Sequence, residues 1–307
     1  MKIKDKLKII QDISGLTQTE IAIKIGVSFV ALNNWWNEKS LPRKKKEKTI
    51  DDLYKEYTGQ NIIPETALSA KKELVAGKSK KYENILNTIL KNADIYDQFL
   101  LLLTYNSNKI EGSTLSEGEI ADIMFDNKSI PSKSIIEQLE VKNHQAALQF
   151  LFQYLKNAKK IDEKLILKLH SILMNGIRDD AGFYRRQGVR IVGSNVPTAN
   201  FLKVPFLMKG IVKNINKKRD DVIVHVSNVH ARFEQIHPFS DGNGRIGRLI
   251  LAAMLLAGNI APAIIRQEEK RLYYTCLRRA QLKDDFTQLE DFICGAIVIG
   301  FNVLSRK

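Results

Sequence analysis

The segment from His237 to Arg248 concentrates side chains that could handle phosphate. It reads His-Pro-Phe-Ser-Asp-Gly-Asn-Gly-Arg-Ile-Gly-Arg, and so combines a base, a carboxylate, a glycine-rich turn and two guanidinium groups. A histidine with an ordinary pKa of about 6.5, such as His237, can accept a hydroxyl proton near neutral pH. Asp241 is a hard oxygen ligand suited to Mg²⁺, which usually takes few protein carboxylates. These residue types together predict the transfer of a phosphate-linked group.

The local elements are expected to place these groups around an anion site. Pro238 and the triplet 242–244 predict a loop, and the apolar run 246–254 predicts a buried helix after it. The triplet then lies at a helix N-terminus, where glycines permit positive φ and free N–H groups attract phosphate. Arg245 and Arg248 are three residues apart in the first turn, so both guanidiniums can bind phosphate oxygens from one side.

Every motif position of this segment resembles the active-site signature of the Fic (Fic/DOC) family, His-Pro-Phe-x-Asp/Glu-Gly-Asn-Gly-Arg-x-x-Arg. Most members with an intact signature move AMP from ATP to a protein hydroxyl. The resemblance implies that His237 is the general base for a Ser, Thr or Tyr hydroxyl, Phe239 the loop anchor and Asp241 the magnesium ligand. It also implies phosphate contacts from Gly242, Asn243, Gly244, Arg245 and Arg248, the last two at the β- and γ-phosphates. We therefore expect a protein adenylyltransferase with ATP as substrate and Mg²⁺ as cofactor.

An upstream segment, Ser107-Asn108-Lys109-Ile110-Glu111-Gly112, resembles the family's inhibitory pattern Ser/Thr-x-x-x-Glu-Gly/Asn. Its position resembles that in Fic proteins whose inhibitory helix precedes the core. A Glu111 carboxylate paired with Arg248 would occupy the guanidinium that should hold the γ-phosphate, so ATP would bind in a posture unsuited to transfer. The resemblance thus implies autoinhibition by Glu111, with Ser107 and Gly112 as the other residues of the inhibitory motif.

The stretch 182–208 resembles the region of the family that contains a β-hairpin flap, which aligns the target peptide. The β-branched residues Val189, Ile191 and Val192 suit a strand, and Arg190 lies among them. An exposed strand edge could add the target as a further strand through backbone hydrogen bonds that ignore its sequence.

The segment Arg271-Leu272-Tyr273-Tyr274 resembles the part of the family that closes over the adenine. Tyr273 and Tyr274 would supply a stacking surface for the base. Better-known members have an asparagine where this chain has Gln281, which can offer similar hydrogen bonds on a longer arm.

The N-terminal region has a separate pattern. Thr17 and Glu20 form a capping box, Gly26 ends the helix that they begin, and Ser28 caps a second helix through Trp36. Two short helices around a glycine turn predict a helix-turn-helix, and the spacing resembles the repressor-like (Cro/XRE-type) DNA-binding domain. By that resemblance the residues that would contact DNA are Gln18, Ser28, Phe29 and Asn33. A dimerisation or protein-docking module of the same fold is the open alternative.

Composition limits the remaining choices. The net charge of +14 attracts nucleic acid, acidic proteins or anionic membranes without choosing among them. No uninterrupted run of 18 apolar residues exists, so we expect no membrane partner. Residues 1–8 lack an apolar secretory segment, which predicts a cytoplasmic protein. Cys276 and Cys294 look like small buried hydrophobes rather than a disulfide or a metal pair.

We expect an all-α fold of two parts. A helix-turn-helix-like domain covers residues 1–57. A linker with a short helical stretch around 65–74 covers 58–81, and a Fic core covers 82–307 as a helical bundle with one small β-hairpin. The inhibitory helix is expected near 104–112 and the active-site loop at 237–248. The expected partners are a protein with a hydroxyl side chain, the enzyme's own chain as a substrate, and DNA or a second copy of the chain in a homodimer.

Other functions stay open from the sequence. The same site could remove AMP, or use another donor such as UTP or a CDP-alcohol, with Glu111 orienting a water. Alternatively the chain is a transcriptional regulator in which the helix-turn-helix binds DNA and the Fic core senses a ligand. A purely structural protein is disfavoured, because it leaves the phosphate loop without a role.

Overall fold

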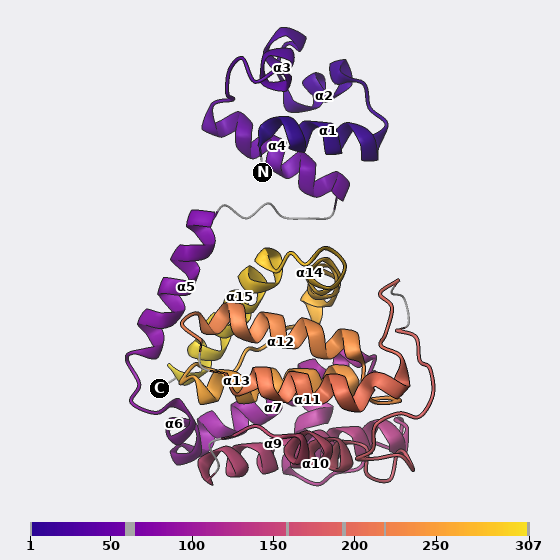
Figure 1. Cartoon of the computed structure of the whole chain (residues 1–307). Helices are drawn as coiled ribbons and strands as arrows, with labels where there is room; N and C mark the ends of the chain where they lie inside the picture. The colour runs from indigo at the N-terminus through magenta and orange to yellow at the C-terminus, as the bar shows by residue number, and fades with distance from the viewer. Residues whose placement is uncertain (1, 59–64, 158–159, 192–194, 218, 306–307) are drawn as a thin grey trace. The chain divides into compact units, whose positions relative to one another are not determined.

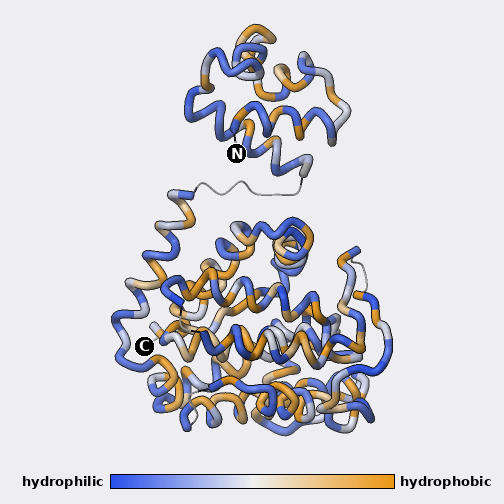
Figure 2. The backbone as a smooth tube through the Cα atoms, in the orientation of Figure 1, coloured by the Kyte–Doolittle hydropathy of each residue, from blue (hydrophilic) through white to orange (hydrophobic). Residues whose placement is uncertain are grey.

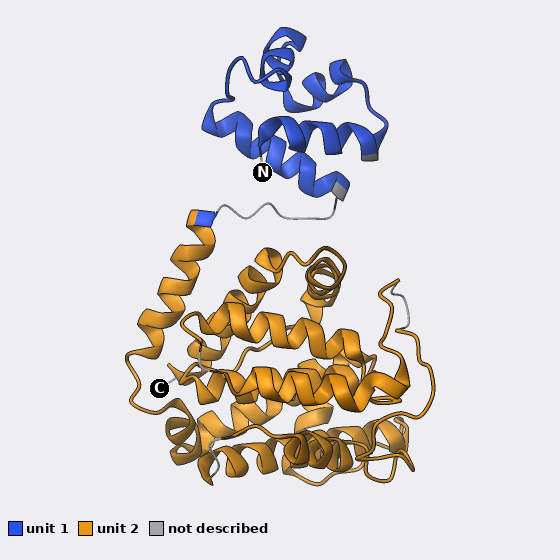
Figure 3. Cartoon of the chain, in the orientation of Figure 1, with its two compact units in different colours: residues 1–65 blue, residues 66–307 orange. Residues whose placement is uncertain are grey.

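The computed structural model describes residues 2–58, 65–157, 160–191, 195–217 and 219–305 (Figure 1). The chain divides into two compact units, Met1–Glu65 and Thr66–Lys307 (Figure 3). The helices of both units mix apolar and polar residues along their length, as expected when one side of each helix is buried (Figure 2).

Residues 2–58 of unit 1 form four helices: α1 (Ile3–Ser14), α2 (Gln18–Ile25), α3 (Phe29–Trp36) and α4 (Lys44–Thr58). The helix ends are those that the caps predict. The Thr17 side chain accepts from the Glu20 N–H in a full capping box, Gly26 has φ 71°, and the Ser28 side chain accepts from the N–H of Ala31. Lys46 donates to the carbonyl oxygens of Ile25 and Gly26, each at 2.8 Å, so one lysine of the basic run caps the C-terminus of α2.

The core of unit 1 is small and apolar. All four helices contribute fully buried side chains to it: Leu7, Ile10, Ile21, Leu32 and Ile50. Helix α1 packs on α3 and α4, and α2 packs on α3 and α4. The α2–turn–α3 pair is therefore held on a scaffold made by the other two helices.

Every regular element assigned to the described residues of unit 2 is a helix. Its helices are α5 (Glu65–Ser79, whose first residue belongs to unit 1), α6 (Ile85–Lys91), α7 (Ala93–Glu111), α8 (Glu117–Phe125), α9 (Ile135–Asn157), α10 (Glu163–Leu173), α11 (Val204–Ile215), α12 (Val222–Ile236), α13 (Asn243–Ala257), α14 (Lys270–Lys283) and α15 (Thr287–Leu304), with 3₁₀ turns at Phe201–Lys203 and Gln267–Glu269. This confirms the predicted all-α class.

Helix α13 is the centre of unit 2. It contacts α7, α9, α10 and α12 (Figure 1). All of its residues from Leu249 to Leu256 are buried. The predicted apolar run 246–254 thus forms the most deeply buried helix, and the loop before it is fixed to the core of the unit.

The interval 58–81, expected as a linker, holds helix α5. Lys72 pairs with Asp221 and Glu290 at 2.7 Å each, and the Ser79 hydroxyl donates to the Asn259 carbonyl at 2.5 Å. These polar contacts attach α5 to unit 2, and a pattern of local apolar spacing cannot reveal them. Residues 59–64 lie outside the described residues.

The stretch 182–208 differs from the expected β-hairpin. No strand is assigned to its described residues, which include Val189, Arg190 and Ile191, and Val192 lies outside them. Side chains bind the backbone here in place of a strand ladder. The Thr198 hydroxyl donates to the Val189 carbonyl at 2.8 Å, and buried Arg185 donates to the carbonyls of Gln187, Ala199, Ile236 and His237.

Helix α15 is long and apolar enough, by length and composition alone, to cross a membrane. Two-thirds of it is buried inside the unit, where it packs on α7, α12 and α14. It is therefore placed as a core helix of unit 2.

Candidate active site

His237, the expected general base, ends helix α12 in the left-handed region (φ 52°, ψ 62°), with its N–H donating to Phe233 O at 3.0 Å. Its Nδ1 lies 3.2 Å from the Glu234 carbonyl oxygen, which can only accept, so Nδ1 carries the hydrogen and Nε2 keeps a lone pair. Burial lowers the pKa of His237, although the Glu234 carbonyl opposes that shift. The ring is therefore neutral at pH 7 and can accept a proton.

The loop after His237 is fixed by Phe239 and Asn243. The Asn243 side chain accepts from the Phe239 N–H at 2.8 Å and donates to the Phe239 carbonyl at 2.9 Å. The buried Phe239 ring stacks on His170, with centroids 3.7 Å apart and planes at 6°. His170 accepts from the Gly182 N–H at Nδ1, which leaves Nε2–H to donate to the Asp241 carbonyl at 3.1 Å. Burial lowers the pKa of His170 to about 4, which keeps this tautomer neutral.

The glycines at the start of helix α13 let other groups come close to its backbone. Gly242, its N-cap, has φ 76°, a conformation that suits glycine. A β-carbon at Gly244 would collide with Oε1 of Glu111 and would lie 3.1 Å from Nη1 of Arg248. The second glycine of the triplet is thus required here by the carboxylate packed against it.

Arg248 joins helix α13 to the C-terminal turn of α7. Its Nε donates to the Ser107 hydroxyl at 2.9 Å, and its Nη2 donates to the Ser107 carbonyl at 3.1 Å and to Glu111 Oε1 at 2.6 Å. Helix α7 ends there because Gly112 has φ 110°. Burial would raise the pKa of Glu111, but Arg248 outweighs it and holds the pKa below its usual value. The structure therefore brings together the residues that the inhibitory pattern predicts.

The guanidinium of Arg245, expected at the β-phosphate, is paired with carboxylates in this structure. It is buried and donates from Nη1 to Glu140 on α9 at 2.6 Å, while Nη2 lies 3.7 Å from Asp241. A buried guanidinium needs an anionic partner, and a carboxylate on another helix supplies it.

An open cavity of about 890 Å³ lies above the start of α13. Its lining includes all of His237, Asp241, Gly242, Asn243, Gly244 and Arg248, together with Glu111, Arg190, Ile191, Glu234, Lys270, Arg271, Tyr273, Tyr274, Arg278 and Gln281. The expected base, anion site, flap residues and adenine contacts therefore share one cavity. The cations on α14 add positive charge that a polyphosphate would require.

The three residues expected to contact adenine differ in solvent exposure. Tyr273 is buried and its hydroxyl lies 2.7 Å from His230 Nε2, so its ring belongs to the core. Gln281 is also buried and donates to the Ala231 carbonyl at 3.2 Å. The ring of Tyr274 is the more exposed of the two tyrosines, so it is the better stacking surface.

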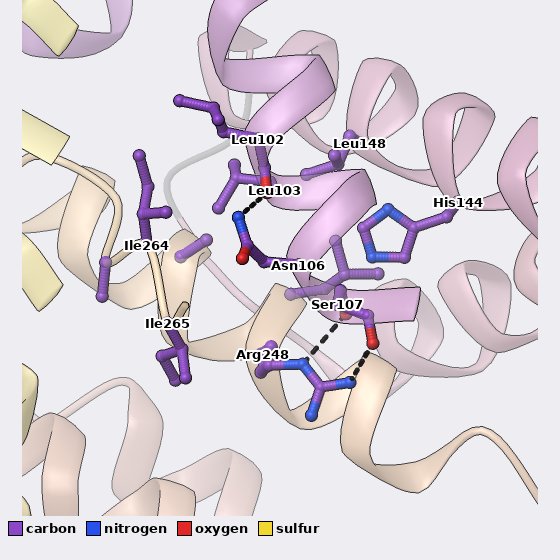
Figure 4. Close-up of a pocket in the computed structure, with 12 residues that line it drawn as sticks. Leu102, Leu103, Asn106, Ser107, His144, Leu148, Arg248, Ile264 and Ile265 are labelled. Carbon is purple, nitrogen blue, oxygen red and sulfur yellow. Dashed lines mark hydrogen bonds between the residues drawn. The ribbon is translucent and has the colours of Figure 1, made fainter. Parts of the chain in front are cut away.

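A small apolar pocket lies on the side of Arg248 that faces α7 and α9 (Figure 4). It encloses about 20 Å³ and is lined mainly by leucine, isoleucine and alanine side chains. His144 at its edge is neutral, because burial lowers its pKa to about 3. Arg248 thus sits in apolar surroundings, where its pairing with Glu111 is stronger than it would be in water.

Glu234 contributes a buried carboxyl group to the cavity. It is 6% exposed, and its Oε1 finds no hydrogen-bond partner among the described residues. The carboxyl packs so closely on α13 that a β-carbon at Gly247 would collide with it. Burial raises the pKa of Glu234 to about 8, with Arg248 opposing and Glu111 adding to the shift. It is therefore mostly protonated at pH 7.

Three residues of the site were not expected: His170, Glu140 and Glu234. Each lies in a long helical run, and its role depends on a partner distant in the sequence. The sequence signal that could have found such residues is a polar side chain at a position on the buried face of a helix. Glu234 is an example, because it lies one turn beyond buried His230 on α12.

Asp241 fits a single-carboxylate magnesium site. Its side chain is 52% exposed and lines the cavity beside the anion-binding turn. Within the described residues there is no group of three or more His, Cys, Asp or Glu side chains that could hold a metal by themselves. Mg²⁺ commonly takes one or two carboxylates and completes its shell with phosphates and water.

Residues 160–255 match the Fic/DOC family, and the chain therefore carries a Fic/DOC domain. It is 35% identical over 189 residues to protein adenylyltransferase fic-1 of Caenorhabditis elegans, which covers 60% of this chain and 37% of that protein. It is 30% identical over 185 residues to protein adenylyltransferase Fic of Aedes aegypti, with 59% and 37% covered. The chain thus matches well under half the length of these curated relatives.

Solved structures show the same fold. A Fic domain-containing signaling protein from Bacteroides thetaiotaomicron superimposes with a TM-score of 0.67 at 22% identity, over 76% of this chain and 96% of that one. Fic-1 from C. elegans (residues 134–508) gives a TM-score of 0.68 at 22% identity, over 93% and 84%.

The Arg245–Glu140 pair should be important for stability. We expect Glu140→Ala to lower the free energy of unfolding by about 3 kcal/mol, because it leaves a buried guanidinium with only a distant carboxylate. Urea denaturation at pH 7 measures this. Lys128→Ala, which breaks an exposed pair with Asp122, is the control and should change stability little. Equal effects of the two variants would contradict a stabilising role of the Arg245–Glu140 pair.

The raised pKa of Glu234 predicts a pH-dependent stability. Between its ordinary pKa of 4.5 and the folded value of about 8, the folded state holds a proton that the unfolded state releases. Stability should therefore fall as pH rises through this window, by up to about 1.4 kcal/mol per pH unit. Glu234→Gln should remove that loss, so its advantage over the wild type should widen from pH 5 to pH 8. Exposed Glu117→Gln should follow the wild type; parallel curves for all three proteins would refute the prediction.

Proposed function

We propose that the chain is a protein adenylyltransferase that moves AMP from ATP to a Ser, Thr or Tyr hydroxyl of a protein. The observation that carries this is the neutral His237, with its free Nε2, on the same cavity as the glycine-bounded start of α13. A base and an anion site next to each other suit attack on a phosphate. The names of the curated relatives support the same activity.

In the proposed reaction the residues of the chain position the nucleotide, neutralise the charge of its phosphates and accept a proton. The N–H groups at the start of α13 hold the phosphates, and Tyr274 stacks on the base. His237 Nε2 takes the proton of the target hydroxyl as its oxygen forms a bond to the α-phosphorus. The bond from the α-phosphorus to the bridging oxygen breaks, and pyrophosphate leaves. Mg²⁺ held by Asp241 would neutralise charge on the phosphates.

We propose that the resting protein is inhibited by Glu111. The Glu111 carboxylate binds Arg248 and fills the space next to Gly244. In the proposed reaction the outer phosphates would bind at the same two positions. Coulomb attraction in apolar surroundings stabilises that blocked arrangement. An activating event must therefore separate Glu111 from Arg248.

Removal of the Glu111 carboxylate tests both proposals. With labelled ATP and Mg²⁺, Glu111→Gly should acquire at least about tenfold more label on itself or on proteins of a cell lysate than the wild type. Adding His237→Ala should lower that signal by about a hundredfold or more, as loss of a general base does.

A matched control is Lys109→Gly, which weakens the same last turn of α7 and keeps the carboxylate; it should stay as silent as the wild type. No gain of label with Glu111→Gly over the double variant would reject the proposed transfer. Release of AMP from a modified target by the wild type alone would indicate removal instead.

For unit 1 we propose DNA binding through the start of α3. The support is the short α2–turn–α3 pair with its glycine turn, in which Ser28 and Phe29 are exposed and Gln18 is half-buried. Asn33 is less available, because Asn37 donates to its side chain at 2.8 Å.

Phosphate contacts by lysine and arginine should give an affinity that falls steeply with salt. Fluorescence anisotropy with duplex DNA from upstream of the gene measures this. Ser28→Glu should weaken binding about tenfold or more, because it places an anion at the helix N-terminus that faces DNA. Glu38→Gln, away from that terminus, is the control. Salt-independent or absent binding would favour a docking module.

A further inference from the structure

The cavity contains two carboxyl groups close to one guanidinium. Glu111 pairs with Arg248 Nη2, while Arg248 Nη1 is buried and finds no partner among the described residues. Glu234 lies against Gly247, the residue before Arg248, and its Oε1 is likewise buried and without a partner within the described part of the chain. The structure thus leaves an unused donor of Arg248 and an unused acceptor of Glu234 in one site.

The other groups around Glu234 do not supply a competing charge. On its own helix, His230 carries its hydrogen on Nδ1, which faces the Gly247 carbonyl, and burial keeps it neutral with a pKa of about 3. His237 is also neutral. On α14, Tyr273 and Tyr274 are uncharged, because burial raises their pKa values. The cations Lys270, Arg271 and Arg278 also line the cavity, but the charges that shift the Glu234 pKa are those of Arg248 and Glu111.

We propose that Glu234 is a second carboxyl group that competes with the nucleotide's terminal phosphate for Arg248, and that it must hold a proton while another anion occupies that guanidinium. This rests on the proposed function in one respect, namely that the phosphate binds Arg248.

The reason is charge balance in a buried site. One guanidinium is neutralised by one negative group, and a second carboxylate beside the pair would be a desolvated, uncompensated charge. With Glu111 in place, Glu234 is therefore neutral. When Glu111 leaves, Arg248 loses its partner and the repulsion on Glu234 disappears, so Glu234 can ionise and pair with it. An arriving phosphate must then drive a proton back onto Glu234.

The test compares Glu111→Gly with Glu111→Gly/Glu234→Gln. The probe is α,β-methylene-ATP with Mg²⁺, measured by calorimetry from pH 6 to pH 9 in two buffers of different ionisation heat. For the single variant, Kd should rise about tenfold per pH unit above the pKa of Glu234, with uptake of close to one proton. The double variant should lack that proton uptake and bind more tightly at high pH. Glu111→Gly/Glu117→Gln is the matched control and should behave as the single variant.

A second measurement does not require the double variant to fold. Carbon-13 labelling of glutamate carboxyls in Glu111→Gly follows Glu234 directly, and the probe should raise its pKa. Equal pH profiles with the same proton uptake, or an unchanged Glu234 titration, would overturn the proposal while leaving nucleotide binding and the proposed function intact. Absence of probe binding by every variant would overturn both.

Discussion

The organisation of the site depends on the buried guanidinium of Arg248. Because it is desolvated, it must be paired, and the pairing groups come from the end of α7, far from α13 in the sequence. This requirement fixes the end of α7 over the start of α13, and Gly244 leaves the room that the approach needs. The cavity, the proposed anion site and the proposed inhibition therefore depend on the same electrostatic constraint.

His237, the proposed general base, is positioned by neutral groups and by the Arg185 guanidinium, which donates to its carbonyl oxygen at 2.7 Å. Asn243 ties the loop to itself, and His170 both stacks on Phe239 and binds the Asp241 carbonyl. Burial lowers the pKa values of His170 and His237 and keeps both rings uncharged. The contacts that position His237 are thus separate from the Arg248–Glu111 pair at the proposed phosphate site.

Local chemistry made much of this predictable. Caps and glycines located α2, α3 and the loop before α13, because each acts within a few residues. Features set by distant partners were missed: α5 is attached by Lys72 to Asp221 and Glu290, Arg245 turns to Glu140, and Glu234 is neutral only through burial. No strand is assigned to the described residues of the expected hairpin; there the Thr198 hydroxyl binds the Val189 carbonyl and Arg185 binds the carbonyls of Gln187 and Ala199, contacts that β-branched composition alone does not reveal.

The contacts of Ser107 give α7 a double role. Ser107 binds Arg248 through its hydroxyl and its carbonyl, at the negative end of the helix dipole, independently of the Glu111 carboxylate. If the Glu111 carboxylate is lost, the two Ser107 contacts remain and keep the Arg248 guanidinium oriented. If Glu111 inhibits as proposed, the same helix turn both blocks Arg248 and orients it, so deletion of the turn would remove the proposed inhibition together with the contacts that hold the guanidinium in place.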